Sequence, residues 1–408
     1  MSAVVSDRVL AATASLAAVQ DFYFNSRYAE RRGQPGVADF TFGNPQEFPL
    51  PGLVQALHRR ADPQNQNWYA YKTNEADACA FLADSLSREL GLAFSPTDIA
   101  MTPGAFGAIA LAFRLLLAPG DEVLIPLPGW FCYGSMLAAE NVKAVQVPLD
   151  PVSFDLDLAA IEAAITPRTR IVVVNSPHNP TGRIYPREQL EALAALLERA
   201  SARLGRRIFL LSDEPYRRIR FDGLPFVSPA AVYPWTLIDY SYGKVLLAPG
   251  QRLGYLALSP LMPAADRRAL SEAFFAAQCS LGWAFPSALM QHAVPDLESL
   301  TIDIAALTRR RDRMVGALSQ WGYEVIRPEG TFYLFGRAGR RQRLAVRRPG
   351  RPRRLRHAGP RARHAAALPR LPDRYRRHDR ARPAGLPGRR PAPRRRLTAF
   401  DRLSRSRP

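Results

Sequence analysis

Short apolar runs alternate along the chain with stretches in which apolar residues recur at helical spacing. The run at 170–174 is β-branched and continuous, which is typical of a strand buried on both faces of a sheet. Further strands are predicted at 121–126, 143–149, 207–212, 236–240 and 253–258, with helices at about 105–117 and 188–200. Strands separated by helices predict an α/β protein with a mostly parallel, doubly wound sheet, in which ligands bind at the carboxyl ends of the strands.

The two ends of the chain depart from this alternation. Residues 9–19 predict an amphipathic helix, 300–321 a long charged helix, and 330–335 the start of a strand. We therefore divide the chain into an N-terminal helix and arm (1–45), a large domain (46–292), the start of a smaller α/β domain (293–336) and a tail (337–408). The smaller domain is expected to be incomplete, because no periodic pattern continues beyond Arg337.

The tail differs in composition from the rest of the chain. The protein carries a net charge of +20, but residues 337–408 hold 26 of its 53 arginines, ten prolines, three aspartates and no lysine. Such a segment buries little surface and repels itself, so we expect disorder. One hypothesis is a frameshift near Arg337, because GC-rich DNA read out of frame yields Arg, Pro, Ala, Gly and His. A tail evolved to bind nucleic acid is less favoured, because Tyr375 and Phe400 are its only aromatic residues.

Cysteine content and hydropathy bear on the compartment. Three scattered cysteines without metal-ligand spacing argue against a disulfide framework and against a metal site, and they fit a reducing cytoplasm. No uncharged run approaches the length of a membrane span, since even the most apolar stretch, 105–118, contains Arg114. A cytoplasmic protein without a membrane partner is therefore expected.

The candidate chemistry begins with a rare residue. The chain contains three lysines, and Lys244 follows a predicted strand in the run Ser-Tyr-Gly-Lys. Lysine, unlike arginine, can lose its proton and form an imine. Two other predicted strands are followed by polar turns, at 175–182 (Asn-Ser-Pro-His-Asn-Pro-Thr-Gly) and at 212–216 (Ser-Asp-Glu-Pro-Tyr). Each segment alone is typical of an ordinary turn, so the indication of a site comes from their combination.

In order, these segments supply an Asn, an Asp, a Tyr three residues after the Asp, a Ser, a Lys three residues after the Ser and an Arg eight residues after the Lys. The ordered set, within a stretch from about 38 to 335, resembles the aspartate-aminotransferase-like family, that is, the class I/II aminotransferases of fold type I. The resemblance implies pyridoxal 5'-phosphate (PLP) as the cofactor.

The resemblance also implies a role for each matching residue around the cofactor ring. Lys244 would form the Schiff base with the cofactor aldehyde and later carry a proton between the substrate and the cofactor. Asp213 would hold the pyridine nitrogen in its protonated form. Tyr216 and Asn179 would bind the phenolic oxygen of the ring.

The cofactor phosphate would be held by Arg252 and Ser241. The backbone NH groups of Ala105 and Phe106 are further candidates, because they open the predicted helix at 105–117 and helix N-termini bind anions. Trp130 matches the family position of an aromatic ring that stacks on the cofactor, and core packing is an almost equally good interpretation.

Two N-terminal features match family positions near the substrate. Gly43 would leave room for the substrate, which Asn179 would also contact. Tyr69 matches a family tyrosine that reaches the phosphate in the neighbouring subunit, and Tyr71 is a competing assignment. Either tyrosine implies a homodimer with shared active sites.

The expected activity is the transfer of an α-amino group from an amino acid to a 2-oxo acid. β-Lyases and cyclopropane-carboxylate synthases share the same cofactor residues and are alternatives. A catalytically impaired protein is a third, because no convincing arginine for the substrate α-carboxylate is found; Arg370 and Arg396 are weak matches in an arginine-rich segment. Loss of the second domain would also expose Phe332, Tyr333 and Phe335. No residue identifies the amino donor.

Overall fold

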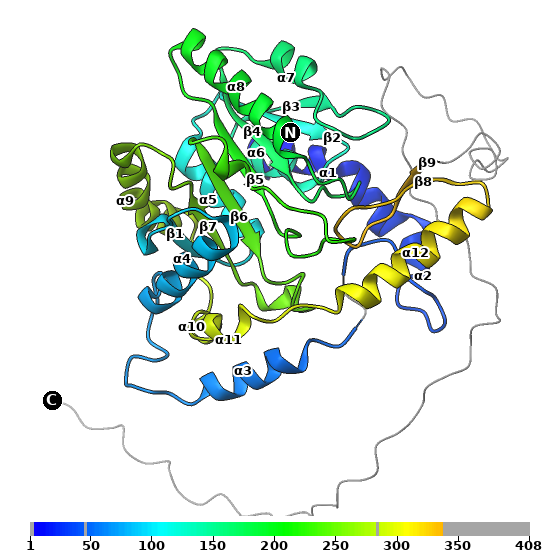
Figure 1. Cartoon of the computed structure of the whole chain (residues 1–408), viewed down its shortest axis with the longest axis horizontal. Helices are drawn as coiled ribbons and strands as arrows, with labels where there is room; N and C mark the ends of the chain where they lie inside the picture. Colours follow the sequence, from blue (N-terminus) through cyan, green and yellow to red (C-terminus); the bar gives the residue numbers. More distant parts are fainter. Residues whose placement is uncertain (1–3, 45–46, 283–284, 338–408) are drawn as a thin grey trace, which may run out of the picture. The chain divides into compact units, whose positions relative to one another are not determined.

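The computed structural model of the chain describes residues 4–44, 47–282 and 285–337 (Figure 1). Seven strands, β1 to β7, form the main sheet, and twelve α-helices and a second, two-stranded sheet complete the described part. The strands of the main sheet are β1 (Ile99–Thr102), β2 (Glu122–Leu127), β3 (Lys143–Pro148), β4 (Thr169–Asn175), β5 (Phe209–Asp213), β6 (Thr236–Ser241) and β7 (Gly254–Leu258). The six strands predicted from 121 to 258 are all present in the main sheet, and β1 is added to them.

The helices fall into three groups along the chain. The first group precedes the sheet: α1 (Asp7–Asn25), α2 (Arg27–Arg31), α3 (Pro51–Ala61) and α4 (Ala76–Leu90). The second group alternates with its strands: α5 (Ala105–Leu116), α6 (Cys132–Ala139), α7 (Leu158–Ala164), α8 (Arg187–Leu204) and α9 (Ala264–Leu281). The third group follows it: α10 (Ala288–His292), α11 (Val294–Leu297) and α12 (Ile304–Gln320), with the second sheet made of β8 (Glu324–Ile326) and β9 (Phe335–Arg337).

The strand order in the main sheet is β1-β7-β6-β5-β4-β2-β3. Every strand runs parallel to the others except β7, which is antiparallel to both β1 and β6. The central strand β4 is buried on both faces, which explains its unbroken apolar sequence. The predicted α/β class with a mostly parallel sheet is confirmed.

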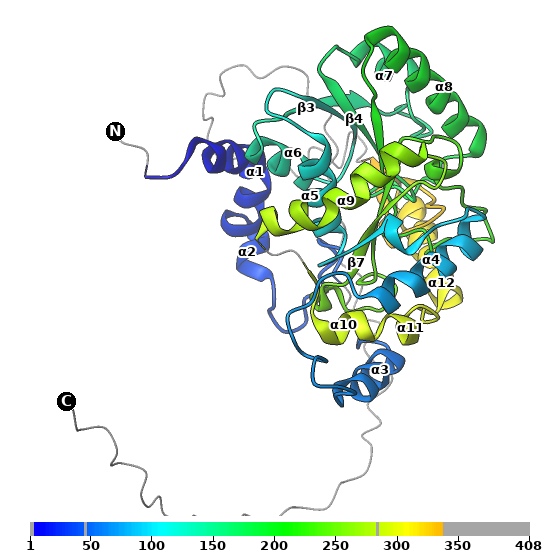
Figure 2. The ribbon, with the colours of Figure 1, turned by 90° about the vertical axis from the view of Figure 1, so that its left-hand side faces the viewer.

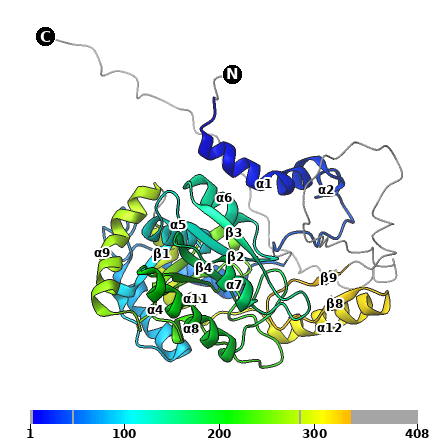
Figure 3. The same ribbon diagram turned by 90° about the horizontal axis from the view of Figure 1, so that it is seen from above.

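Alternate residues of the strands enter two different cores. On β6, Leu237 belongs to a cluster that includes Ala108 and Ala112 of α5, whereas Ile238 belongs to a cluster that includes Leu82 of α4. Helix α9 packs along α5 (Figure 2), and α1 packs against α6 (Figure 3). The sheet is therefore covered on both faces, and its strand ends are left to form a site. Within the described helices, none is both long and apolar enough to cross a membrane.

The strand predicted to start at residue 330 begins instead at Phe335. The preceding segment is bound to the large domain: Gly330 N donates to Gly182 O at 2.9 Å, and Thr331 N donates to Ile219 O at 3.0 Å. Thr331 also has a positive φ of 67°, which no β-strand residue adopts. Hydrogen bonds to the large domain, including an isolated β-bridge between Arg220 and Gly330, therefore override the strand propensity of this run.

The expected exposure of Phe332, Tyr333 and Phe335 is also wrong. Phe335 is buried against Phe154, with ring centroids 5.5 Å apart, and the other two are half-buried. Arg311 of α12 anchors the same region, since it donates to both carboxylate oxygens of Asp222 at 2.9 and 3.0 Å. The tail from residue 338 onward, with Arg370 and Arg396, lies outside the described residues, and its predicted disorder stays a prediction.

Candidate active site

The polar turns singled out in the sequence meet at the carboxyl ends of three neighbouring strands. Asn175 is the last residue of β4, Asp213 the last of β5 and Ser241 the last of β6. Asn175 joins two of the turns, because its Nδ2 donates to Asp213 O at 2.8 Å and its Oδ1 accepts from Asn179 N at 2.6 Å. Parallel strands that end at one edge bring these distant segments together.

Asp213 is a buried carboxylate, and only one of its two oxygens accepts a hydrogen bond from a described residue. It is 4% exposed; Tyr133 donates its hydroxyl hydrogen to Oδ2, and Oδ1 has no hydrogen-bond partner among the described residues. Burial raises the pKa of the Asp213 carboxyl, and the hydrogen bond from Tyr133, the adjacent Asp239 side chain and the charge of Lys244 oppose that rise. A buried acceptor without a partner is unfavourable unless a ligand supplies a donor. The protonated pyridine nitrogen of PLP would be such a donor, so this position fits the cofactor.

Tyr133 was not among the residues singled out in the sequence. A usable signal was present, since Tyr133 follows the Pro-Gly-Trp turn by three residues at the start of α6. It is 2% exposed, and its ring lies edge-on to that of Trp130 at 5.1 Å. Its hydroxyl therefore positions the Asp213 carboxylate from within the core.

Replacing Tyr133 by phenylalanine is expected to weaken the binding of PLP by about tenfold or more, because a hydrogen bond to a charged group is lost in the core. Tyr185→Phe is the matched control, since the Tyr185 hydroxyl is buried without a partner in the described part of the chain. Fluorescence titration of the cofactor-free variants with PLP measures the effect. Equal affinities of the two variants would contradict the role given to Tyr133.

Lys244 lies in the turn that follows β6, and its side chain enters the site. Its Nζ is 5.7 Å from the ring centroids of both Tyr216 and Phe332. Burial lowers the pKa of the Lys244 amine; the charge of Asp213 raises it, and the charge of Arg252 lowers it further. A lowered pKa increases the fraction of neutral amine, which is the nucleophilic form.

Tyr216 and Tyr333 form a hydroxyl pair near this lysine. Their oxygens are 3.0 Å apart, and the Asn179 side chain also hydrogen-bonds the Tyr216 hydroxyl. Gly43 lies against the pair, because a Cβ at that position would be 2.0 Å from the Tyr333 hydroxyl oxygen. Tyr333 is a second site residue that the sequence does not reveal, because the run at 330–335 predicts only a strand.

The predicted phosphate residues meet at the N-terminus of α5. The Arg252 guanidinium donates to Pro103 O and to Pro249 O, both at 3.0 Å, and a Cβ on Gly104 would be 3.2 Å from its Nη2. The NH groups of Ala105 and Phe106 open the helix and have no intrahelical acceptor. Ser241 ends β6, which is separated from β1 by β7, and its Oγ accepts from Gly243 N at 3.3 Å. A cation, helix NH groups and a hydroxyl together suit a phosphate.

The remaining predicted residues lie around these groups. Trp130 is half-buried and edge-on to Phe106 at 4.9 Å, so it borders the phosphate end and also packs against the core. Tyr69 is 54% exposed, with its hydroxyl donating to Ala61 O, and Tyr71 projects fully into solvent. No contact recorded within the described chain joins either tyrosine to the other predicted site residues.

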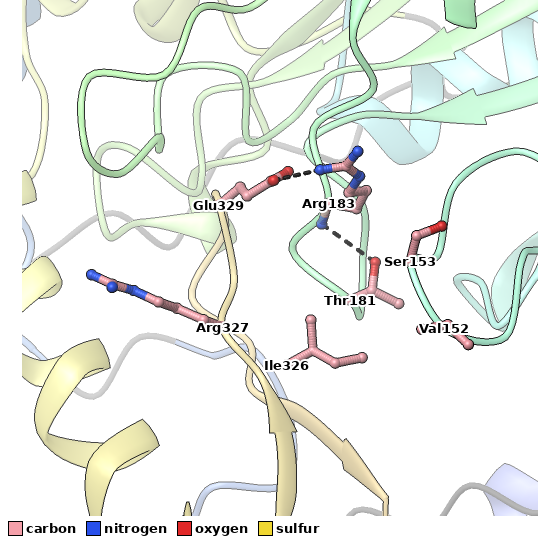
Figure 4. A pocket seen from close by; sticks show the side chains of 7 residues that line it. All are labelled: Val152, Ser153, Thr181, Arg183, Ile326, Arg327 and Glu329. Atoms are coloured by element: carbon pink, nitrogen blue, oxygen red, sulfur yellow. Dashed lines mark hydrogen bonds and ion pairs between the residues drawn. The ribbon is translucent and has the colours of Figure 1, made fainter.

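A pocket in the described residues lies apart from these groups. It measures about 210 Å³ and is lined by residues of the Thr181–Arg183 turn, of the loop at Val152 and Ser153, and of the segment from Ile326 to Glu329 (Figure 4). Arg183 points toward Glu329 and forms an ion pair with it, while Arg327 points away (Figure 4). None of the predicted cofactor-binding residues lines this pocket.

Comparisons with known proteins agree with this geometry. The profile of the family described as aminotransferase class I and II matches residues 35–348. An aspartate/prephenate aminotransferase of Thermus thermophilus is 33% identical over 308 residues, which are 74% of this chain and 77% of that protein. An aspartate aminotransferase of Rhizobium meliloti is 33% identical over 317 residues, covering 75% of this chain and 73% of the relative.

Solved structures agree as well. The crystal structure of an amino transferase from Eubacterium rectale has a TM-score of 0.73 and 31% identity, covering 79% of this chain and 81% of that one. An aspartate aminotransferase from Thermus thermophilus with maleate has a TM-score of 0.66 and 29% identity, covering 81% of this chain and 84% of that one.

Proposed function

The chain belongs to the class I and II aminotransferase family, and from this membership we propose how its own residues carry out the reaction. It is a pyridoxal-phosphate-dependent aminotransferase, which moves an amino group from an amino acid to a 2-oxo acid. The observation that carries the assignment of the site is the unpartnered Oδ1 of the buried Asp213, at the strand ends where the lysine turn and the α5 N-terminus converge. None of the relatives reported above favours a lyase or a synthase.

In this proposal Asp213 holds the cofactor's pyridine nitrogen, and Tyr216 with Asn179 binds the phenolic oxygen. The phosphate is held by Arg252, Ser241 and the NH groups of Ala105 and Phe106, while Trp130 covers the ring. When bound, PLP supplies an electron-accepting ring that stabilises negative charge at the substrate α-carbon. The support is the convergence of these groups on one edge of the sheet, and the large domain at 46–292 is the proposed cofactor-binding unit.

Lys244 has two proposed tasks. Its Nζ would hold the cofactor covalently through the cofactor's aldehyde group, with release of water, and burial favours the neutral amine that this requires. With an amino acid bound in its place, the free Lys244 amine would be the base that takes the proton from the substrate α-carbon and returns it during the reaction. Gly43 and Asn179 are the proposed substrate contacts, because Gly43 lies against Tyr333 beside Tyr216.

Aspartate is the first amino donor to test, since two of the relatives are named for it. We assign no described arginine to the substrate α-carboxylate. The two weak matches in the sequence, Arg370 and Arg396, lie outside the described residues. The frameshift hypothesis for the tail is tested by resequencing the gene. A confirmed frame, with no conventional C-terminal domain encoded in another frame, would contradict it.

The activity is tested with the full-length chain loaded with PLP and mixed with a panel of amino acids, aspartate first. A donor that changes the visible absorbance of the bound cofactor and is converted to its 2-oxo acid supports transamination. Release of pyruvate and ammonia would indicate a lyase instead. Bound cofactor that no amino acid alters would indicate an impaired enzyme and overturn the proposal.

A homodimer is proposed, with Tyr69 reaching the phosphate site of the partner subunit. Two observations support it: Tyr69 is 54% exposed, and Phe106, at the phosphate end of the site, is 41% exposed. Mixing inactive Lys244→Ala chains with Tyr69→Ala chains is expected to restore activity in mixed dimers, because one intact site forms. Tyr71→Ala in place of Tyr69→Ala tests the competing assignment, and a monomer by analytical ultracentrifugation would contradict both.

The cytoplasm is the proposed compartment. Cys79, Cys132 and Cys279 are all free thiols, and Cys279 is exposed. An exposed free thiol persists in a reducing environment. No membrane partner is proposed, and nucleic-acid binding would rest on the tail alone.

A further inference from the structure

A second buried carboxyl group lies beside Asp213 in the sheet. Asp239 on β6 is the register partner of Asp213 on β5, so the two side chains project from the same face of neighbouring strands about 4.8 Å apart. Asp239 is 0% exposed and Asp213 is 4% exposed. Three of their four carboxylate oxygens, namely Asp213 Oδ1 and both oxygens of Asp239, have no hydrogen-bond partner among the described residues.

Few other charges reach this pair from the described elements packed against it. Leu256 of β7 is the register partner of Asp239 on its other side. The titratable or charged groups around the pair are Tyr133 of α6, Tyr216, Tyr333, Lys244 after β6, and Glu214 next to Asp213, which pairs with Arg217. The charge of Lys244 lowers the pKa of Asp213 and so favours its ionised form.

Two adjacent carboxylates cannot both ionise in such a place, because like charges in a buried site repel strongly. If both were ionised, neither could donate a hydrogen bond to the other. A single proton converts their contact into a hydrogen bond and leaves one negative charge near Lys244. Asp213 already accepts a hydrogen bond from Tyr133, so it is the better of the two to stay ionised.

We propose that Asp239 is a positioning residue that keeps its proton at neutral pH and donates it in a hydrogen bond to the ionised carboxylate of Asp213. Burial, together with the charge of Asp213, raises the pKa of the Asp239 carboxyl well above its ordinary value, in agreement with this arrangement. The consequence rests on the proposed function: the donated hydrogen bond keeps Asp213 ionised in a buried site. Because each carboxylate oxygen can accept two hydrogen bonds, Asp213 still has an acceptor position for the protonated ring nitrogen of the cofactor.

The proton itself is detected without cofactor or substrate. Infrared spectra of the full-length cofactor-free chain at pH 7 are expected to contain the carbonyl stretch of a protonated carboxylic acid. That stretch should disappear in Asp239→Asn and persist in Asp213→Asn. Its presence unchanged in Asp239→Asn, its loss in Asp213→Asn, or its absence from the wild type would each overturn the proposal.

The consequence is measured as PLP affinity by fluorescence titration. Asn at position 239 keeps a hydrogen-bond donor, so Asp239→Asn should bind PLP within about threefold of the wild type, whereas Asp239→Leu should lose about tenfold or more. Equal losses in both variants, or no loss in either, would overturn the proposed role of the donor. The infrared result does not depend on transaminase activity, so failure of this inference and failure of the proposed function are distinguished.

Discussion

Lys244→Ala is expected to lower the rate of amino-group transfer by about 10⁴-fold or more. General acid–base catalysis by a positioned side chain contributes up to about 10⁴-fold, and this substitution also removes the covalent link to the cofactor. The half-reaction with aspartate, followed by the absorbance of the bound cofactor in stopped flow, measures the loss. The variant should still bind PLP non-covalently, because Asp213, Tyr216 and Arg252 are unchanged.

Lys143→Ala is the matched control for this result. The Lys143 side chain is 65% exposed on β3 and pairs with Glu122 at 3.0 Å, so its loss should change the rate by less than about twofold. A small primary amine added to Lys244→Ala should restore part of the rate, since it supplies the missing proton carrier. A Lys244→Ala chain that transfers amino groups at the wild-type rate would refute the assignment of the lysine.

Arg217→Ala is expected to lower the free energy of unfolding by about 3–5 kcal/mol, because it leaves the buried Glu214 carboxylate without its cation. The Arg217 side chain is 0% exposed and donates to both carboxylate oxygens of Glu89, at 3.1 and 3.0 Å. It also lies 3.4 Å from the carboxylate of Glu214, which is itself fully buried. Urea denaturation of the cofactor-free chain measures the change.

Arg187→Ala is the matched control, because it removes an exposed ion pair instead of a buried one. Arg187 and Glu191 form an exposed pair on α8, and removing it should change stability by less than about 1 kcal/mol. Equal effects of Arg187→Ala and Arg217→Ala would contradict the importance of the buried cluster.

The stability difference between the wild type and Arg217→Ala should also depend on pH. Burial alone would raise the pKa of Glu89, but the charges of Arg217 and Arg218 lower it to about 2. Because this folded-state pKa lies below the ordinary value of 4.5, the ion pair stabilises the fold fully above about pH 5. Its contribution is lost as the pH falls toward 2, so the gap between the two proteins should shrink over that range.

The fold was largely predictable because the inner strands of its main sheet are buried on both faces. A run such as 170–174 has no polar face to confuse its pattern, and the structure places it at the centre of the sheet as β4. Prediction failed at 330–334, where hydrogen bonds to Gly182 and Ile219 decide the conformation. Those partners lie more than a hundred residues away, and no local pattern encodes them.

The sequence by itself determined which chemical groups are available, because Lys244, Asp213 and Asn179 stand in turns after strands, and parallel strands bring such turns to one edge. Only the tertiary structure decided what surrounds them. Tyr133 reaches Asp213 from helix α6, and Asp239 becomes the neighbour of Asp213 through the register of β5 and β6. The physical reason is that spacing along a chain specifies local conformation, whereas burial, and with it the protonation state of a carboxyl group, depends on segments that meet only in the folded protein.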